Sequence, residues 1–176
     1  NAMNAKDERY TRFALCREML ETVRVVGDFD VERTKPVAGT LAGVGKALFT
    51  GEGSSRIFPA KNAIRKALTW GAGLCALTEG SRQAGTYKLD DVAVFCASNS
   101  GRTKEVVGLA RSLREAGHEH VYAVTAHEGT PLGAQAAETF VLTCGGEDAV
   151  AATKSVAEQA LLYQTLVAQV AGRDAA

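Results

Sequence analysis

The sequence lacks an excess of charge of either sign, a long apolar run and any pair of cysteines spaced as C-x-x-C. Twenty Lys and Arg residues balance twenty Asp and Glu residues, so the chain has none of the basic excess that nucleic-acid-binding domains carry. No run approaches the roughly 18 apolar residues that a membrane span needs. The sequence therefore predicts neither a nucleic-acid partner nor a membrane partner.

The cysteines are too far apart in the chain to suggest a metal site or a redox pair. Three of the four, Cys75, Cys96 and Cys144, lie in apolar runs, which favours buried, reduced thiols that pack as small hydrophobic side chains. The N-terminus has no charged and then apolar leader, and residues 1–3 are typical of a cloning remnant. We therefore expect a cytoplasmic protein.

Short apolar runs and longer segments of helical periodicity alternate along most of the chain. The runs show no polar–apolar alternation, which predicts strands buried on both faces, as in a parallel sheet. These runs are 47–50, 74–78, 92–97, 121–125 and 139–143. With helices between them, among others over 103–116 and 149–171, they predict an α/β fold: a flavodoxin-like three-layer αβα sandwich with a five-stranded parallel sheet.

Residues 4–46 precede this alternation and are interpreted as an N-terminal helical segment. A helix with one apolar stripe is predicted from residue 6 to about residue 26. After a break at Gly27, a weaker helical stretch ends near Gly45. The remaining residues, 47–172, have the length of one domain.

In sheets of this type ligands bind beyond the carboxyl ends of the strands, so the site is expected in the loops that follow them. The string SNSGRT at 98–103 places three hydroxyls and an amide at a predicted helix start, where free N–H groups and the helix dipole attract an anion. Gly101 would let a bulky oxyanion approach the backbone. The same pattern fits a simple Ser/Thr helix cap, and it is not a Walker A loop.

The loop after the first strand, GEGSS at 51–55, is less specific. It suits contact with a sugar hydroxyl, and it suits a simple chain turn equally well. Arg56 stands where a dinucleotide-binding G-x-G-x-x-G would have its last glycine, which counts against that reading. Glu52 could repel a phosphate or recognise an amino or hydroxyl group.

Three strings in order along the chain resemble those of the sugar isomerase (SIS) domain family. They are GEGSS at 51–55, SNSGRT at 98–103 and EDAVAATK at 147–154. The likeness is closest to the isomerase half of glucosamine-6-phosphate synthase and to related ketose/aldose phosphosugar isomerases. It implies that 47–172 is a single SIS domain that binds a phosphorylated sugar and needs no metal or other cofactor. The implied binding residues are Gly53, Ser54, Ser55, Ser98, Asn99, Ser100, Gly101 and Thr103.

The resemblance places the family's acid/base carboxylate at Glu147. One carboxylate can move a proton between C1 and C2 of a sugar phosphate through an enediol, and partial burial is expected to raise its pKa to suit this role. A simpler role for Glu147 is a negative charge favoured at a helix N-terminus. Lys154 is either a cation near the substrate or a solvated helix lysine.

Ring opening needs a second proton-transfer group, for which His127, after the fourth strand, is the candidate; an ordinary loop histidine is the alternative. In synthase-like relatives this role belongs to a histidine on the helix after the glutamate, donated by a neighbouring subunit. The segment 153–171 contains no histidine. His118 and His120 precede the fourth strand and are expected to be exposed.

The resemblance, with the residues that match it, implies a phosphosugar isomerase. The alternative is a non-catalytic phosphosugar-binding or regulatory SIS module. A transcription regulator would need a three-helix DNA-binding unit, whereas residues 4–46 hold at most two predicted helices. Apolar stripes on the helices at 6–26 and 149–171 predict a homodimer or homotetramer.

Overall fold

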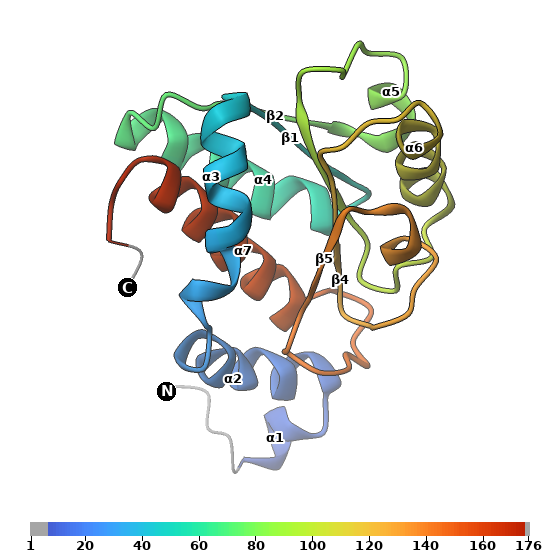
Figure 1. Ribbon diagram of the computed structural model, residues 1–176. Helices are drawn as coiled ribbons and strands as arrows, with labels where there is room; N and C mark the ends of the chain where they lie inside the picture. The colour runs from blue at the N-terminus through green and yellow to red at the C-terminus, as the bar shows by residue number, and fades with distance from the viewer. Residues whose placement is uncertain (1–6, 175–176) are drawn as a thin grey trace.

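A five-stranded parallel sheet lies at the centre of the computed structural model, which describes residues 7–174 (Figure 1). The strand order is β2-β1-β3-β4-β5, and all four neighbouring pairs are parallel. The strands are β1 (Lys46–Gly51), β2 (Cys75–Gly80), β3 (Ala93–Ala97), β4 (Val121–Thr125) and β5 (Glu138–Val141). The interpretation of residues 1–3 and the start of the predicted first helix lie outside the described residues.

The inner strands explain why the apolar runs do not alternate. Every residue of β3 and β4 is buried, and β1 is buried from its second residue on. A strand covered by helices on both faces needs apolar side chains on both. The edge strands β2 and β5 are only partly buried. The prediction of five parallel strands is confirmed, with each strand close to its predicted bounds.

Helices cover both faces of the sheet and complete the predicted three layers. On one face, α3, α4 and α7 cover the sheet (Figure 1). In the core beneath them, Phe95 stacks on Phe49 and Tyr122, and the ring of Tyr163 packs tilted against Phe49. On the other face, α5 and α6 cover a smaller aliphatic core. The helices are α1 (Glu8–Thr11), α2 (Ala14–Gly27), α3 (Lys35–Val44), α4 (Ser54–Trp70), α5 (Ser81–Ala84), α6 (Lys104–Glu115) and α7 (Lys154–Val170), with 3₁₀ turns at Val31–Thr34 (η1) and Gly133–Gln135 (η2).

Two predicted helices differ from the structure at their ends. The helix expected over residues 6–26 is divided, because Phe13 has an extended backbone and stands at the N-cap of α2. The helix expected over 149–171 begins only at Lys154. Residues 149–153 form a loop instead, and the free amides at the helix start are taken up by a carboxylate described below.

The cysteines follow the prediction in two of three cases. Cys96 and Cys144 are buried, and burial raises the pKa of each thiol to about 12. The prediction that Cys75 is buried was wrong, because this residue opens the edge strand β2 and is exposed. Among residues 7–174, no helix combines the length and apolar character that a bilayer crossing requires.

The N-terminal segment packs on α7 through α2, η1 and α3. A buried ion pair links them: Nη1 of Arg33 lies 3.1 Å from Oε1 of Glu158, whose side chain is fully buried in α7. Arg33 also donates to the carbonyl of Val141 at the end of β5. Glu158 accepts further hydrogen bonds from the backbone amides of Thr143 and Cys144. The pair therefore ties η1, the end of β5 and α7 together.

We expect the substitution Arg33→Met to lower the free energy of unfolding by about 3 kcal/mol, because it leaves the Glu158 carboxylate buried without its cation. The matched control is Arg24→Met, whose partner Asp28 is exposed and 3.8 Å away, with an expected change within about 0.5 kcal/mol. Urea unfolding of the three proteins measures both values. Equal losses in the two variants would contradict this account of the buried pair.

Candidate functional site

A cavity of about 440 Å³ opens beyond the carboxyl ends of β1, β3, β4 and β5. Loops that are far apart in the sequence meet there, as parallel strands require. Its lining consists of Glu52, Ser55, Ala97, Ser98, Asn99, Ser100, Thr103, His127, Gly145, Gly146 and Glu147. Seven of the residues proposed from the sequence thus share one cavity: Ser55, Ser98, Asn99, Ser100, Thr103, His127 and Glu147. The lining does not include Gly53, Ser54, Gly101 or Lys154.

The loop after β3 is held in shape by its own hydroxyls. Oγ of Ser98 lies 2.8 Å from Oγ1 of Thr103, and the Ser98 side chain is almost fully buried. Ser100 is exposed, and its Oγ accepts a hydrogen bond from the amide of Arg102. The loop leads directly into α6, whose first amides have no intrahelical partner and favour an anion. Ser98 and Thr103 therefore shape the loop, while the Ser100 hydroxyl is open to a ligand.

Gly101 is required by the fold of this loop. Its φ is +63°, a conformation that other residues rarely adopt. A Cβ at this position would also stand 2.4 Å from Cβ of Thr130, which belongs to the loop after β4. Close packing between the two loops thus accounts for this glycine.

Glu147 is surrounded by hydrogen-bond donors. Its Oε1 accepts from the amide and the hydroxyl of Thr153, at 2.8 and 2.9 Å, and from the amide of Ser155. Its Oε2 accepts from Nδ2 of Asn99 at 3.0 Å and from the hydroxyl of Ser155. The carboxylate therefore caps the N-terminus of α7 while it lines the cavity. Thr153 and Ser155 were missed from the sequence, although they flank the Lys154 of the third string.

The hydrogen bonds decide the charge state of Glu147. Burial raises its pKa, but the hydrogen bonds from Ser155 and Thr153 together lower it by more, so its pKa lies below the ordinary value of 4.5. The expectation that partial burial would leave this pKa raised was wrong, because it left out the amides and hydroxyls at the start of α7. Glu147 is ionised at neutral pH and can act only as a proton acceptor in that state.

The loop after β1 brings a second carboxylate to the cavity. Oε1 of Glu52 accepts a hydrogen bond from the amide of Ser81 at 3.0 Å. Gly53 is the N-cap of α4 with φ 57° and ψ −136°, a backbone conformation confined largely to glycine. Ser54 and Ser55 form the first turn of α4, and the carbonyl of Ser55 accepts from Nε2 of Gln159 in α7.

The remaining candidates differ in their surroundings. His127 lines the cavity, where its backbone amide donates to the hydroxyl of Thr125. Lys154 is not a solvated lysine: it is 4% exposed, and its Nζ donates to Glu21 of α2 at 2.6 Å and to the carbonyl of Gly146. The expectation that His118 and His120 are exposed was wrong, since both are half-buried and His118 hydrogen-bonds to a loop carbonyl.

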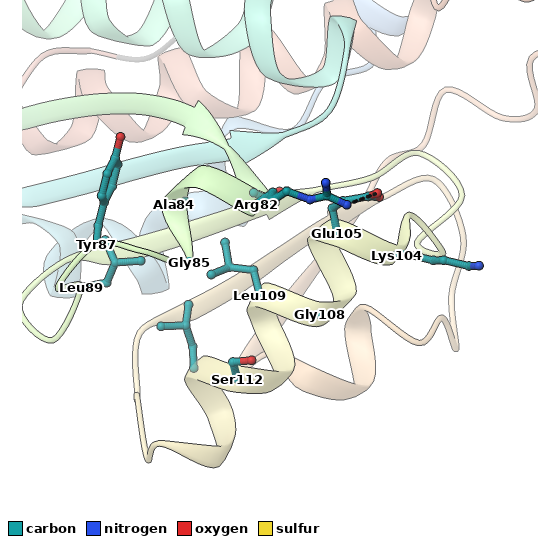
Figure 2. Close-up of a pocket in the computed structure, with 12 residues that line it drawn as sticks. Arg82, Ala84, Gly85, Tyr87, Leu89, Lys104, Glu105, Gly108, Leu109 and Ser112 are labelled. Carbon is teal, nitrogen blue, oxygen red and sulfur yellow. Dashed lines mark ion pairs between the residues drawn. The ribbon is translucent and has the colours of Figure 1, made fainter.

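A second hollow, of about 490 Å³, lies between α5 and α6 on the other side of the sheet (Figure 2). Arg82 and Glu105 form an ion pair of 4.0 Å across it, over a floor that includes Leu89 and Leu109. Its lining contains none of the residues proposed from the sequence. The cavity at the strand ends, with its carboxylates and hydroxyls, is therefore the candidate functional site.

With this geometry in view, comparison with known proteins identifies the class of the chain. The profile of the SIS domain matches residues 40–169, so the chain belongs to the SIS domain family. A curated relative, the glutamine–fructose-6-phosphate aminotransferase (isomerizing) of Aeropyrum pernix, is 33% identical over 138 residues. That match covers 77% of this chain but only 22% of the relative.

Solved structures share the fold. A candidate phosphosugar isomerase from Silicibacter pomeroyi is 25% identical, with a TM-score of 0.66, and the match covers 89% of this chain and 49% of that one. The c3406 protein of E. coli CFT073, solved in complex with A5P, is 20% identical, with a TM-score of 0.72 over 97% of this chain and 93% of that one. The chain thus spans about a fifth of the curated relative and half of the first of these structures.

We expect Glu147 to stabilise the folded protein above pH 4.5 and to lose this effect as the pH falls through its lowered folded-state pKa. The difference in free energy of unfolding between the wild type and Glu147→Gln should therefore shrink as the pH falls from 7 to about 3.5. Chemical denaturation at a series of pH values measures it. A constant difference, or a Glu147 side chain that titrates above 4.5 by NMR, would contradict the lowered pKa.

Proposed function

We propose that the protein is a phosphosugar isomerase that interconverts an aldose phosphate and a ketose phosphate, with Glu147 as the proton shuttle. The observation that carries the proposal is that an ionised carboxylate and a hydroxyl-rich loop at a helix start line the same cavity. Membership of the SIS family and the phosphosugar bound by a solved relative support the substrate class.

The loop at 98–103 is the proposed phosphate site. A phosphate there would face the free amides at the start of α6, with the exposed hydroxyl of Ser100 as a further donor. These donors are uncharged, so they bind a dianion without a cation. The negative charge of Glu52 and Glu147 on the other loops favours a pose in which the phosphate lies at this loop and the sugar extends toward the carboxylates.

In the proposed reaction the Glu147 carboxylate takes a proton from one of the first two sugar carbons, and an enediolate forms. The same carboxyl group returns the proton to the other carbon, while the hydroxyl proton passes between the two oxygens. Nδ2 of Asn99 donates to Glu147 and to the Ser155 hydroxyl, and a developing oxyanion beside Glu147 would take one of these two protons in place of its present acceptor. His127 is the proposed group for ring opening, because it lines the same cavity.

One observation favours the alternative of a non-catalytic phosphosugar-binding module. The hydrogen bonds that Glu147 accepts from Ser155 and Thr153 lower its pKa, which makes it a weaker base. A catalytic step would require the sugar to displace at least one donor, the side chains of Asn99 and Ser155 being the movable ones. The phosphate site is the same in both functions, so only turnover distinguishes them.

We expect the wild type to interconvert at least one aldose–ketose phosphate pair, and Glu147→Gln to lose about 10³-fold or more in kcat while it keeps phosphosugar binding. A coupled assay over pentose and hexose phosphates measures turnover, and thermal shift measures binding, because a ligand of the native state raises its melting temperature. Glu115→Gln, at the exposed end of α6, is the matched control. Binding without turnover in the wild type would establish the module in place of the enzyme, and no binding at all would refute both.

We also propose that the protein is a homodimer or homotetramer in the cytoplasm. The apolar stripe predicted on 149–171 is not free for a partner, because Tyr163 and Val167 are buried in the core of the chain itself. One face of α2 carries Leu15, Met19, Val23 and Val26, which are between 41% and 79% exposed. A second copy of the chain would cover this face. Four free cysteines suit a reducing compartment.

Light scattering should give the wild type the mass of two or four chains, and Val23→Glu the mass of one, because a carboxylate at the centre of the α2 face would be buried without a partner. Leu68→Glu on α4, at an equally exposed apolar position, is the control and should keep the wild-type mass. A monomeric wild type at micromolar concentration would refute the assembly.

A further inference from the structure

The loop that carries Glu147 has no regular secondary structure of its own. It runs from residue 142, after β5, to residue 153, before α7. A catalytic carboxylate on such a loop must be held in place by its surroundings, because an error of about 1 Å in its position can cost roughly 10²-fold in rate. The contacts that hold the loop come from α2, a helix of the N-terminal segment.

Glu18 of α2 holds the residues directly after Glu147. Its side chain is 5% exposed, although α2 lies at the surface. Oε1 of Glu18 accepts hydrogen bonds from the amides of Asp148 and Ala149, at 2.5 and 3.1 Å. Hydrogen bonds between amides and a carboxylate are roughly twice as strong as those between neutral groups. This buried acid lies 129 positions from Glu147 in the sequence.

Thr153 connects the two glutamates. Its hydroxyl lies 2.9 Å from Oε1 of Glu147 and 3.3 Å from Oε2 of Glu18. Because a hydroxyl has one proton to donate, the shorter contact assigns that proton to Glu147. Glu18 thus lies next to the side chain that donates to Glu147, and it holds the loop through the amides of Asp148 and Ala149.

Glu21, one turn further along α2, holds the other side of the loop. It pairs with Nζ of Lys154 at 2.6 Å, and the hydrogen bond lowers the pKa of Glu21 and raises the pKa of Lys154. The same Nζ donates to the carbonyl of Gly146, the residue before Glu147. The loop is thus fixed immediately before and immediately after its carboxylate.

We propose that Glu18 and Glu21 are positioning residues that hold Glu147 beside the cavity, so that the N-terminal helix α2 is part of the catalytic unit. The kinetic part of this inference rests on the proposed isomerase function. The structural part, that α2 fixes the loop, does not.

The experiment compares Glu18→Ala and Glu18→Gln with the wild type in the full chain. The alanine removes every contact to the loop. The glutamine keeps one carbonyl oxygen for the two amides and can donate to Thr153, so it should restore most of the restraint. Asp28→Ala, just after the end of α2, is the control, because Asp28 is exposed and its ion pair with Arg24 is long.

Two readouts are measured: NMR-detected hydrogen exchange of the amides of Asp148 and Ala149, and kcat and KM with the best sugar phosphate. In Glu18→Ala we expect exchange to be about 10-fold faster or more. We expect kcat to fall about 10- to 100-fold while KM changes less than about 3-fold, because the phosphate loop is untouched. Glu18→Gln should lie close to the wild type and Asp28→Ala should equal it.

Unchanged exchange in Glu18→Ala would overturn the proposal, and so would faster exchange with an unchanged kcat. If Glu18→Ala fails to fold, Glu21→Ala at its half-exposed position takes its place with the same expected fall in kcat, and an unchanged kcat in that variant would overturn the proposal. If the wild type turns over no sugar phosphate, the isomerase proposal fails separately, and the exchange of the two amides alone decides whether α2 holds the loop.

Discussion

The hydrogen bonds between the Glu147 carboxylate and the start of α7 are the interaction on which the site depends. They end the loop after β5, they set where α7 begins, and they keep the carboxylate charged. A helix start supplies both free amides and a favourable dipole, which makes it a natural place to hold a negative charge in a partly buried position. The same donors that hold the carboxylate also lower its pKa, so they make it a weaker base.

Helix capping and the proposed proton transfer therefore fall to the same side chain. Besides capping the helix, the carboxylate lines the cavity that it shares with the hydroxyls of the loop after β3. A carboxylate that served only as a base would have a higher pKa, and so be a stronger base, with fewer donors around it. The contacts from Glu18 and Glu21 fix the loop from outside the cavity. They add no further hydrogen bond to Glu147 itself.

Local sequence patterns predicted the fold and the loop after β3, but they did not predict the surroundings of Glu147. Apolar runs without alternation predicted buried parallel strands, and parallel strands place their loops at one edge whatever the side chains are. The contacts of Glu18 and Lys154 join residues 130 and 133 positions apart in the chain, and no periodicity encodes them. Burial of Glu147 was foreseen, but the sign of its pKa shift depends on donors that only the folded loop brings near.

The most direct test of the central claim is a crystal structure of the protein soaked with pentose and hexose phosphates. The account predicts the phosphate at the loop 98–103, within hydrogen-bond distance of the Ser100 hydroxyl and the first amides of α6, and the first two sugar carbons beside the Glu147 carboxylate. A phosphate bound in the hollow between α5 and α6, or a sugar whose first carbons lie away from Glu147, would contradict it.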